Sequence, residues 1–203
     1  MNKLIVEFIG TFFLVQAVGH AVLTQSALAG LVIGLTLMVM VYAGGHISGG
    51  HYNPAVTLAV WLRGKLPKSD VLPYIAAQTA GAVASALIVQ QFRGTSSGAF
   101  VHDTLRIAGA EFLGTFALAW VVLNVATAKG TAGNSFYGAA IGMTVAAGIF
   151  LFGGISGAVF NPAVAIAGGI LNLLPLKTVA LYLVVCSVAG LAAAKLFLKI
   201  EKR

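Results

Sequence analysis

Charged residues are scarce in this sequence. Only 8% of its 203 residues are Asp, Glu, Lys or Arg, whereas a soluble globular domain contains about a quarter. Hydrophobic residues make up 59%, so the chain has too few polar side chains to cover a core in water. This composition excludes an ordinary soluble domain and indicates a protein whose outer surface contacts lipid.

The sequence also has little that would support catalysis or metal binding. Its single cysteine, Cys186, lies in an apolar run and has no partner for an intrachain disulfide, so we interpret it as a small core residue. The four histidines are scattered without the spacing of metal ligands, and no nucleophile is paired with a base. We therefore expect no enzyme activity, no metal site and no cofactor.

Two long stretches contain no charged residue. Residues 8–62 and 130–176 are each long enough for two spanning helices of about 20 residues, with a shorter piece left over. The shorter pieces begin near Asn53 and Asn161, and we expect them to enter the membrane and turn back. The pattern predicts an all-α membrane protein with six spanning helices, over about residues 4–23, 28–43, 71–91, 107–127, 135–152 and 178–194.

The basic residues are unevenly distributed between the loops. Six spans place both termini on one side, and nine of the twelve lysines and arginines then fall on that side. Because cytoplasmic loops carry the excess of basic residues, we expect cytoplasmic termini in a plasma or bacterial inner membrane. This topology explains the net charge of +7, so we expect membrane lipid and no nucleic acid as a partner. The nine residues are Lys3, Arg63, Lys65, Lys68, Lys129, Lys195, Lys199, Lys202 and Arg203.

The sequence contains an internal repeat. Residues 6–12 (VEFIGTF) match residues 110–116 (AEFLGTF), and residues 44–56 (GGHISGGHYNPAV) match residues 153–164 (GGISGAVFNPAV). Each copy holds three spans, and an odd number means that the second copy crosses the membrane in the opposite sense. We therefore expect a single domain, residues 1–203, made of two inverted repeats over about residues 1–92 and 107–203, with an outer connecting loop over about residues 93–106.

Each repeat contains the motif Asn-Pro-Ala. Asn caps a first helical turn, and Pro at the first helical position loses no hydrogen bond, so each motif predicts the start of a short helix. Two such starts meeting at mid-membrane would repel cations, and their amides would donate to a neutral oxygen. We expect the glycine-rich backbone before each Asn to lack helical bonding and to offer its carbonyls to a wet cavity. The motif residues are Asn53, Pro54, Ala55, Asn161, Pro162 and Ala163.

These features resemble the aquaporin, or major intrinsic protein, family over nearly the whole chain. The two motifs, the run HISGGHYNPAVT at residues 46–57 and the repeated Glu-x-x-Gly-Thr carry the resemblance. It implies six tilted helices, two half-helices that meet at the motifs, and a homotetramer with one pore per subunit. It also implies that Glu7 and Glu111 hold the re-entrant loops from behind. The carbonyls implied to line the pore belong to Gly49, Gly50, His51, Tyr52, Gly157, Ala158, Val159 and Phe160.

The family's second filter, an aromatic and arginine constriction, is where this sequence departs from its relatives. Counted from the motifs, its positions fall at Ile33, Ile149, Ala158 and Val164, which are all apolar. Val164 stands where the family has its arginine, and Ala165 where glycerol-conducting members have an aspartate. We expect an atypical passive channel with a wide apolar constriction. It would pass water and small uncharged solutes such as glycerol, urea, ammonia or uncharged metalloid hydroxides.

Two other functions remain open on the sequence alone. A coupled secondary transporter would share the inverted repeats, and Glu7 and Glu111 could relay protons, although their repeat-related positions favour loop anchors. A poorly conducting structural or junction protein would share the fold, although the short outer connections argue against adhesion. His51 could respond to pH, but we expect it to hydrogen-bond its own loop.

Overall fold

The structure, a computed structural model, describes residues 1–96 and 103–201. All regular secondary structure in these residues is helical, as the sequence predicts. Six helices are long and apolar enough to cross a membrane: α1 (Asn2–Leu23), α2 (Ala29–Ser48), α4 (Lys68–Arg93), α5 (Thr104–Thr127), α6 (Tyr137–Ser156) and α8 (Leu176–Glu201). The shorter elements are α3 (Pro54–Leu62), α7 (Pro162–Ile170) and the 3-10 turn η1 (Lys129–Thr131).

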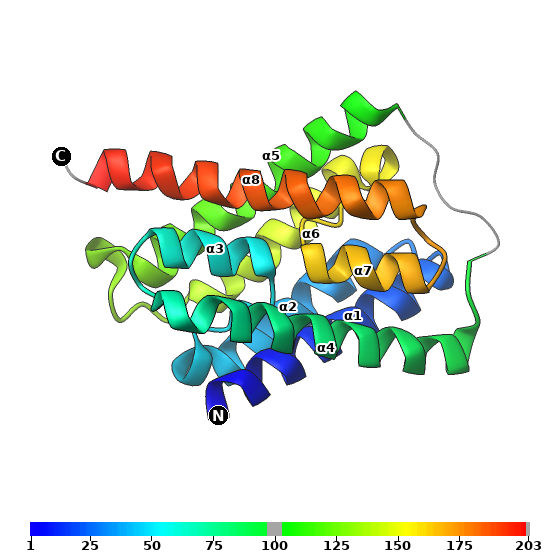
Figure 1. Ribbon diagram of the computed structural model, residues 1–203, viewed down its shortest axis with the longest axis horizontal. Helices are drawn as coiled ribbons and strands as arrows, with labels where there is room; N and C mark the ends of the chain where they lie inside the picture. The colour runs from blue at the N-terminus through cyan, green and yellow to red at the C-terminus, as the bar shows by residue number, and fades with distance from the viewer. Residues whose placement is uncertain (97–102, 202–203) are drawn as a thin grey trace.

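The two short helices lie between the long ones and point their N-termini at each other (Figure 1). α3 packs against α8, and α7 packs against α4, so each half-helix contacts a long helix of the other repeat. α2 and α6 form a further contact between the repeats. The two repeats are therefore interlocked, and neither encloses its own half-helix alone.

α2 and α6 are longer than the sequence predicts. We expected them to end at residues 43 and 152, but they continue to Ser48 and Ser156. A continued helix hydrogen-bonds its own backbone N–H and C=O groups, and lipid offers no other partners for them. The helices end where Gly49 and Gly157 adopt left-handed φ values of 92° and 81°. The expectation that all the glycine-rich backbone is non-helical is therefore wrong, because the non-helical part is confined to residues 49–52 and 157–160.

α8 also extends beyond the predicted end at residue 194. Lys195 and Lys199 continue the helix to Glu201, since basic side chains interact favourably with the negative end of a helix dipole. Arg63, which follows α3, pairs with Glu201 at 2.5 Å and lies 5.1 Å from the ring centroid of Phe197. The end of α8 is therefore tied to the end of the half-helix α3.

The first helix begins and the last helix ends at the same end of the bundle, at the left of Figure 1. This is the arrangement that six spans require. We call this the inner end, because the basic residues expected to be cytoplasmic gather there. Two members of that basic set, Lys202 and Arg203, lie outside the described residues, as do residues 97–102 of the expected outer loop.

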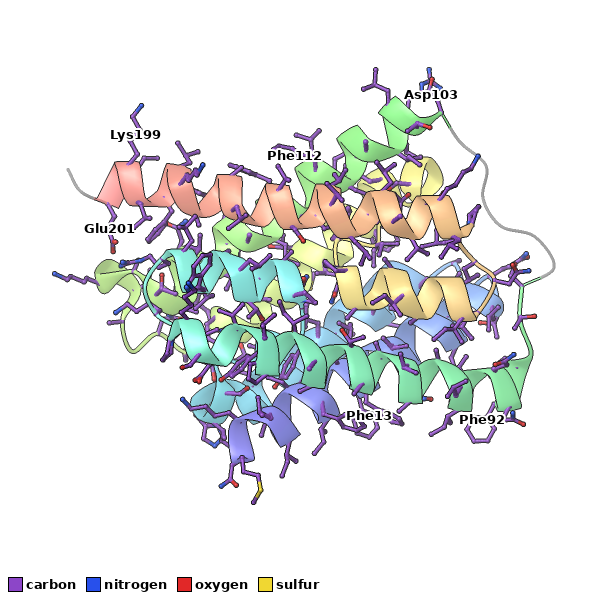
Figure 2. The ribbon with its side chains drawn as sticks, viewed as in Figure 1. Phe13, Phe92, Asp103, Phe112, Lys199 and Glu201 are labelled. Carbon is purple, nitrogen blue, oxygen red and sulfur yellow. The ribbon has the colours of Figure 1, made fainter. Side chains whose placement is uncertain are left out.

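The outer surface of the bundle is apolar, and polar side chains lie inside. Phe13 and Phe92 are 48% and 71% exposed and project away from the helices (Figure 2). In contrast, Glu7, Gln78 and Glu111 are completely buried. This distribution is the reverse of a water-soluble protein and suits a chain surrounded by lipid.

Candidate functional site

The two half-helices begin with the same capping geometry. Asn53 and Asn161 have extended backbones, and their Oδ1 atoms accept hydrogen bonds at 2.9 Å from the backbone N–H groups of Ala55 and Ala163. Pro occupies the first helical position in both. Each Asn therefore satisfies a donor at the positive end of its own half-helix.

The same asparagines also join the two repeats. Asn53 Nδ2 donates to the carbonyl of Phe160 at 2.9 Å, and Asn161 Nδ2 donates to the carbonyl of Tyr52 at 2.9 Å. An amide nitrogen carries two protons, so each Asn has a second N–H that this bond does not use. Both residues line the cavity described below, so we expect the second proton to be available to a solute there.

Glu7 lies behind the first non-helical loop. Its Oε1 accepts from Ser48 Oγ at 2.7 Å and from the backbone N–H of His51 at 2.9 Å. Its Oε2 accepts from the backbone N–H of Tyr52 at 2.7 Å and from Gln78 Nε2 at 2.8 Å. The carboxyl group is thus surrounded by donors and lies behind the loop, away from the cavity that the loop lines.

Glu111 has a matching environment in the second repeat. Its Oε1 accepts from Ser156 Oγ at 2.7 Å and from the backbone N–H of Val159 at 2.9 Å. Its Oε2 accepts from the backbone N–H of Phe160 at 2.7 Å and lies 3.7 Å from the thiol sulfur of Cys186, which donates weakly. Cys186 is fully buried in the core, as the sequence predicts, and it also makes this contact with Glu111.

The acids hold backbone that is in a strained conformation. Tyr52 and Phe160 have φ values of 48° and 50°, a left-handed conformation that costs a non-glycine residue about 1–3 kcal/mol. In each of them the N–H is bound by a buried carboxylate and the carbonyl by an asparagine of the other repeat. In this conformation the carbonyls of Tyr52 and Phe160 meet the asparagine amides of the opposite repeat.

Sequence reasoning missed the tyrosines that complete these loops. Tyr74 Oη donates to the carbonyl of Ser48 at 2.8 Å, and Tyr182 Oη donates to the carbonyl of Ser156 at 2.6 Å. The 108-residue offset that relates Asn53 to Asn161 also relates the two serines, the two tyrosines, and Gln78 to Cys186. This offset is the one signal for them in the sequence, and no repeated motif surrounds either tyrosine.

A narrow cavity of about 80 Å³ runs along the interface of the two repeats. Asn53 and Asn161 line it, and so do all the residues expected to form the constriction. Apolar side chains form most of its wall, and no Lys or Arg of the described residues lines it. The residues expected to form the constriction are Ile33 on α2, Ile149 on α6, Ala158 in the second loop and Val164 on α7.

A wider vestibule of about 760 Å³ lies at the inner end. Lys3 of α1, Lys65 after α3 and Lys129 of η1 line it, so basic groups border the vestibule. His51 and Val122 line both the vestibule and the narrow cavity, and we call this junction the throat. The eight residues whose carbonyls were expected to line a pore all border one of these two spaces.

The whole chain matches a known protein family. The match to the family described as major intrinsic protein covers residues 1–135 and 101–203. The chain is 41% identical over 183 residues to Aquaporin NIP1-3 of Oryza sativa subsp. japonica, covering 84% of this chain and 64% of that protein. It is 38% identical over 176 residues to Nodulin-26 of Glycine max, covering 80% of this chain and 65% of that protein. The chain spans a little less than two thirds of the length of these relatives.

The fold also matches a solved structure. The X-ray structure of the aquaglyceroporin from Plasmodium falciparum aligns with a TM-score of 0.82, covering 97% of this chain and 94% of that chain at 20% sequence identity. At this identity the likeness concerns the fold. It confirms the predicted arrangement of six spanning helices and two half-helices.

Proposed function

Because this chain belongs to the major intrinsic protein family and is an integral, multi-pass membrane protein, we propose that it forms a passive channel for water and small uncharged solutes. The observation that carries the proposal is the meeting of two half-helix N-termini at one cavity, with Asn53 and Asn161 both lining it. Relatives of the chain are named aquaporins.

The half-helices would select against cations. Each helix N-terminus carries about half a positive charge, and two of them face the same space. A cation would meet this potential after losing its water, whereas a neutral oxygen can accept the free N–H of either asparagine. The Asn-Pro-Ala motifs would therefore act as the main charge barrier.

The constriction would select by size and polarity. Ile33, Ile149, Ala158 and Val164 offer no side-chain hydrogen bond, and the short Val164 leaves room that a long arginine would occupy. Loop carbonyls are the remaining polar groups near it. The pore would therefore pass solutes somewhat larger than water, with glycerol, urea, ammonia and uncharged metalloid hydroxides as the candidates.

The assembly and orientation belong to the same proposal. We infer a homotetramer with one pore per subunit, both termini in the cytoplasm, and a plasma or bacterial inner membrane as the location. The basic side chains around the inner vestibule support this orientation. The chain would act as one domain, with two inverted repeats.

A coupled transporter is less well supported. Glu7 and Glu111 are the intramembrane acids that such a mechanism would use, but each already accepts several hydrogen bonds from behind its loop. Neither carboxylate borders the narrow cavity. They are better placed to hold the loops than to carry protons along the pore.

Stopped-flow swelling of proteoliposomes tests the proposal. The purified protein should raise permeability to water and to at least one of the candidate solutes above that of empty liposomes, without a dependence on a pH gradient. Uptake driven by a proton gradient would favour the coupled transporter. Flux equal to that of empty liposomes would favour a structural or junction protein.

A further inference from the structure

The inner vestibule gathers positive charge from three separate elements. Lys3 lies in the first turn of α1, Lys65 follows α3, and Lys129 lies in η1, and all three line the cavity of about 760 Å³. No Asp or Glu of the described residues lines it. The excess of basic residues at cytoplasmic ends does not by itself require this arrangement, because Lys195 and Lys199 lie at the same end of the bundle and do not border the vestibule.

The three ammonium groups have no acidic partner among the described residues. The one ion pair in this part of the chain joins Arg63 to Glu201, so the acid at the end of α8 is already occupied. Glu7 is enclosed by donors behind its loop. Asp70, at the start of α4, does not line the vestibule and pairs with none of the lysines. An anion can therefore bind the lysines without displacing an existing ion pair.

The charge of the lysines exceeds the opposing charge of the backbone. The C-termini of α2 and α5 border the vestibule at Ser48 and Thr127, and each carries about half a negative charge. The three full positive charges of the lysines therefore prevail. A cleft lined by side chains of one sign, with walls of low dielectric constant, concentrates ions of the opposite sign.

Neutral hydrogen-bonding groups border the same cavity. Tyr137 and His46 line the vestibule, and neither the Tyr137 hydroxyl nor the His46 ring has a hydrogen-bond partner among the described residues. The neighbouring Tyr42 differs, because its hydroxyl bonds the backbone of Ser135 and Ala139. A phosphate group offers several oxygens, which ammonium and hydroxyl donors can bind together.

The vestibule leads to a space that a polyanion cannot enter. Beyond the throat, the narrow cavity has a volume of about 80 Å³, and its wall is mostly apolar. A charged group would lose its water there, and no Lys or Arg of the described residues lines this cavity to replace it. An anion held by the lysines would therefore stop at the throat, in the path of neutral solutes.

We propose that the inner vestibule is a binding site for an anion that carries several phosphate charges, held by Lys3, Lys65 and Lys129, and that the bound anion obstructs the entrance to the narrow cavity. A soluble phosphate compound and a lipid headgroup both offer this chemistry, and the experiment below separates them. The binding site goes beyond the proposed channel function, whereas the obstruction rests on it.

Two triple variants with the same loss of charge separate the vestibule from the general surface charge of the inner end. The vestibule variant loses the three lysines that line the cavity. The control variant loses three lysines at the same end that do not line it, and one of these, Lys199, projects away from the bundle (Figure 2). The residues changed to Gln are Lys3, Lys65 and Lys129 in the vestibule variant, and Lys68, Lys195 and Lys199 in the control variant.

Tripolyphosphate is the soluble probe, in phosphatidylcholine proteoliposomes with the probe on both faces, so that the orientation of the inserted protein does not matter. We expect it to lower the water and glycerol permeability of the wild type at low ionic strength, and to do so less at high salt, which screens the lysines. The half-blocking concentration should rise by roughly two- to fivefold when one vestibule lysine is replaced, and further in the vestibule variant. The control variant should respond like the wild type.

A second set of liposomes contains phosphatidylglycerol and tests the lipid headgroup. If a headgroup fills the site, this lipid should lower the flux of the wild type and of the control variant but not that of the vestibule variant, and tripolyphosphate should then have little further effect. If the occupant is soluble, the lipid should leave the flux and the block by tripolyphosphate unchanged. An equal response of the two triple variants to both probes would overturn the proposal.

Isothermal titration calorimetry with tripolyphosphate, in an uncharged detergent, measures binding without transport. Binding to the wild type and the control variant, with weaker or no binding to the vestibule variant, would support the site even in a protein that conducts nothing, and in that case the proposed channel function would fail. No binding to the wild type, or equal binding to the two triple variants, would overturn the site. Binding without any loss of flux in a conducting wild type would overturn the obstruction.

Discussion

Glu7 is a buried carboxylate that accepts from two backbone N–H groups and two side chains. Replacing it by Leu leaves these donors without an acceptor, at about 1–3 kcal/mol for each one that stays buried. We expect Glu7→Leu to lower the unfolding temperature in detergent and to reduce flux in parallel. Glu7→Gln keeps one oxygen as an acceptor, so it should retain much of the thermal stability and much of the flux. A well-folded Glu7→Gln protein without flux would instead indicate a proton-carrying role for this acid.

We expect Val164 to belong to the constriction, at the position where the resemblance implies an arginine. Val164→Arg would add a long cationic side chain with five donors among apolar neighbours, which narrows the opening and supplies groups that bind water. We expect glycerol permeability to fall much more than water permeability, as measured by stopped flow in the same proteoliposomes. Val164→Leu is the control for size without charge. An unchanged glycerol-to-water ratio in a conducting Val164→Arg protein would mean that this position is not part of the filter.

The residues of the site differ in how far the sequence could predict them. Both acids and both asparagines stand in repeated motifs, so their pairing was visible in the chain. Tyr74 and Gln78 have counterparts at the same offset, but single matches of this kind carry little information without the motif around them. The bonds from each Asn to the opposite loop depend on two segments far apart in sequence meeting in space. No local sequence pattern encodes this contact between distant segments.

At the scale of the element, the half-helices provide the charge barrier of the proposed channel. Changing both Asn53 and Asn161 to Asp keeps the oxygen that caps each helix but places negative charge at the two positive ends, which the dipoles stabilise and which partly cancels them. We expect cation or proton conductance to rise in planar bilayer recordings, while water flux persists. Asn172→Asp, the same change outside the half-helices, should have no such effect.

The double variant could instead pass water and show the same cation and proton conductance as the wild type. That result would mean that the half-helix starts do not exclude cations. Each Asp also loses the amide proton that binds the opposite loop carbonyl. The recordings therefore need variants whose water permeability shows an intact pore. Under that condition a rise in conductance reports the electrostatic barrier and not a disordered loop.

The sequence predicted the existence of the helices better than their ends. Apolar stretches and the Asn-Pro pairs located all eight α-helices that the structure describes, because burial in lipid demands apolar length and proline fixes a helix start. The ends of α2 and α6 were placed too early because glycine usually signals a helix stop. In a membrane the backbone must still be hydrogen-bonded, so the helix continues through Gly44. This position is glycine because the side chain of Tyr52 fills the space that a Cβ would need.

At the scale of the whole molecule, the repeats depend on each other for packing. α3 lies against α8, α7 lies against α4, and α2 lies against α6. The Tyr52 and Phe160 carbonyls receive their partners from the opposite repeat. A single repeat would therefore expose the buried face of its half-helix and leave a strained loop without half of its support.

This dependence predicts the behaviour of a divided chain. Residues 1–96 and residues 103–203, produced together as two polypeptides, should co-purify in detergent, because the contacts between the repeats are formed by helices that need no covalent link. Each part produced alone should be degraded or aggregate, since a half-helix cannot be covered within its own repeat. Glu111→Leu in the second part should reduce co-purification, because the loop that carries Asn161 loses its anchor. The contrary result is that either part accumulates stably alone and that the two parts do not associate when both are present. Each repeat would then be an independent folding unit, and the interlocked contacts would not hold the pore together.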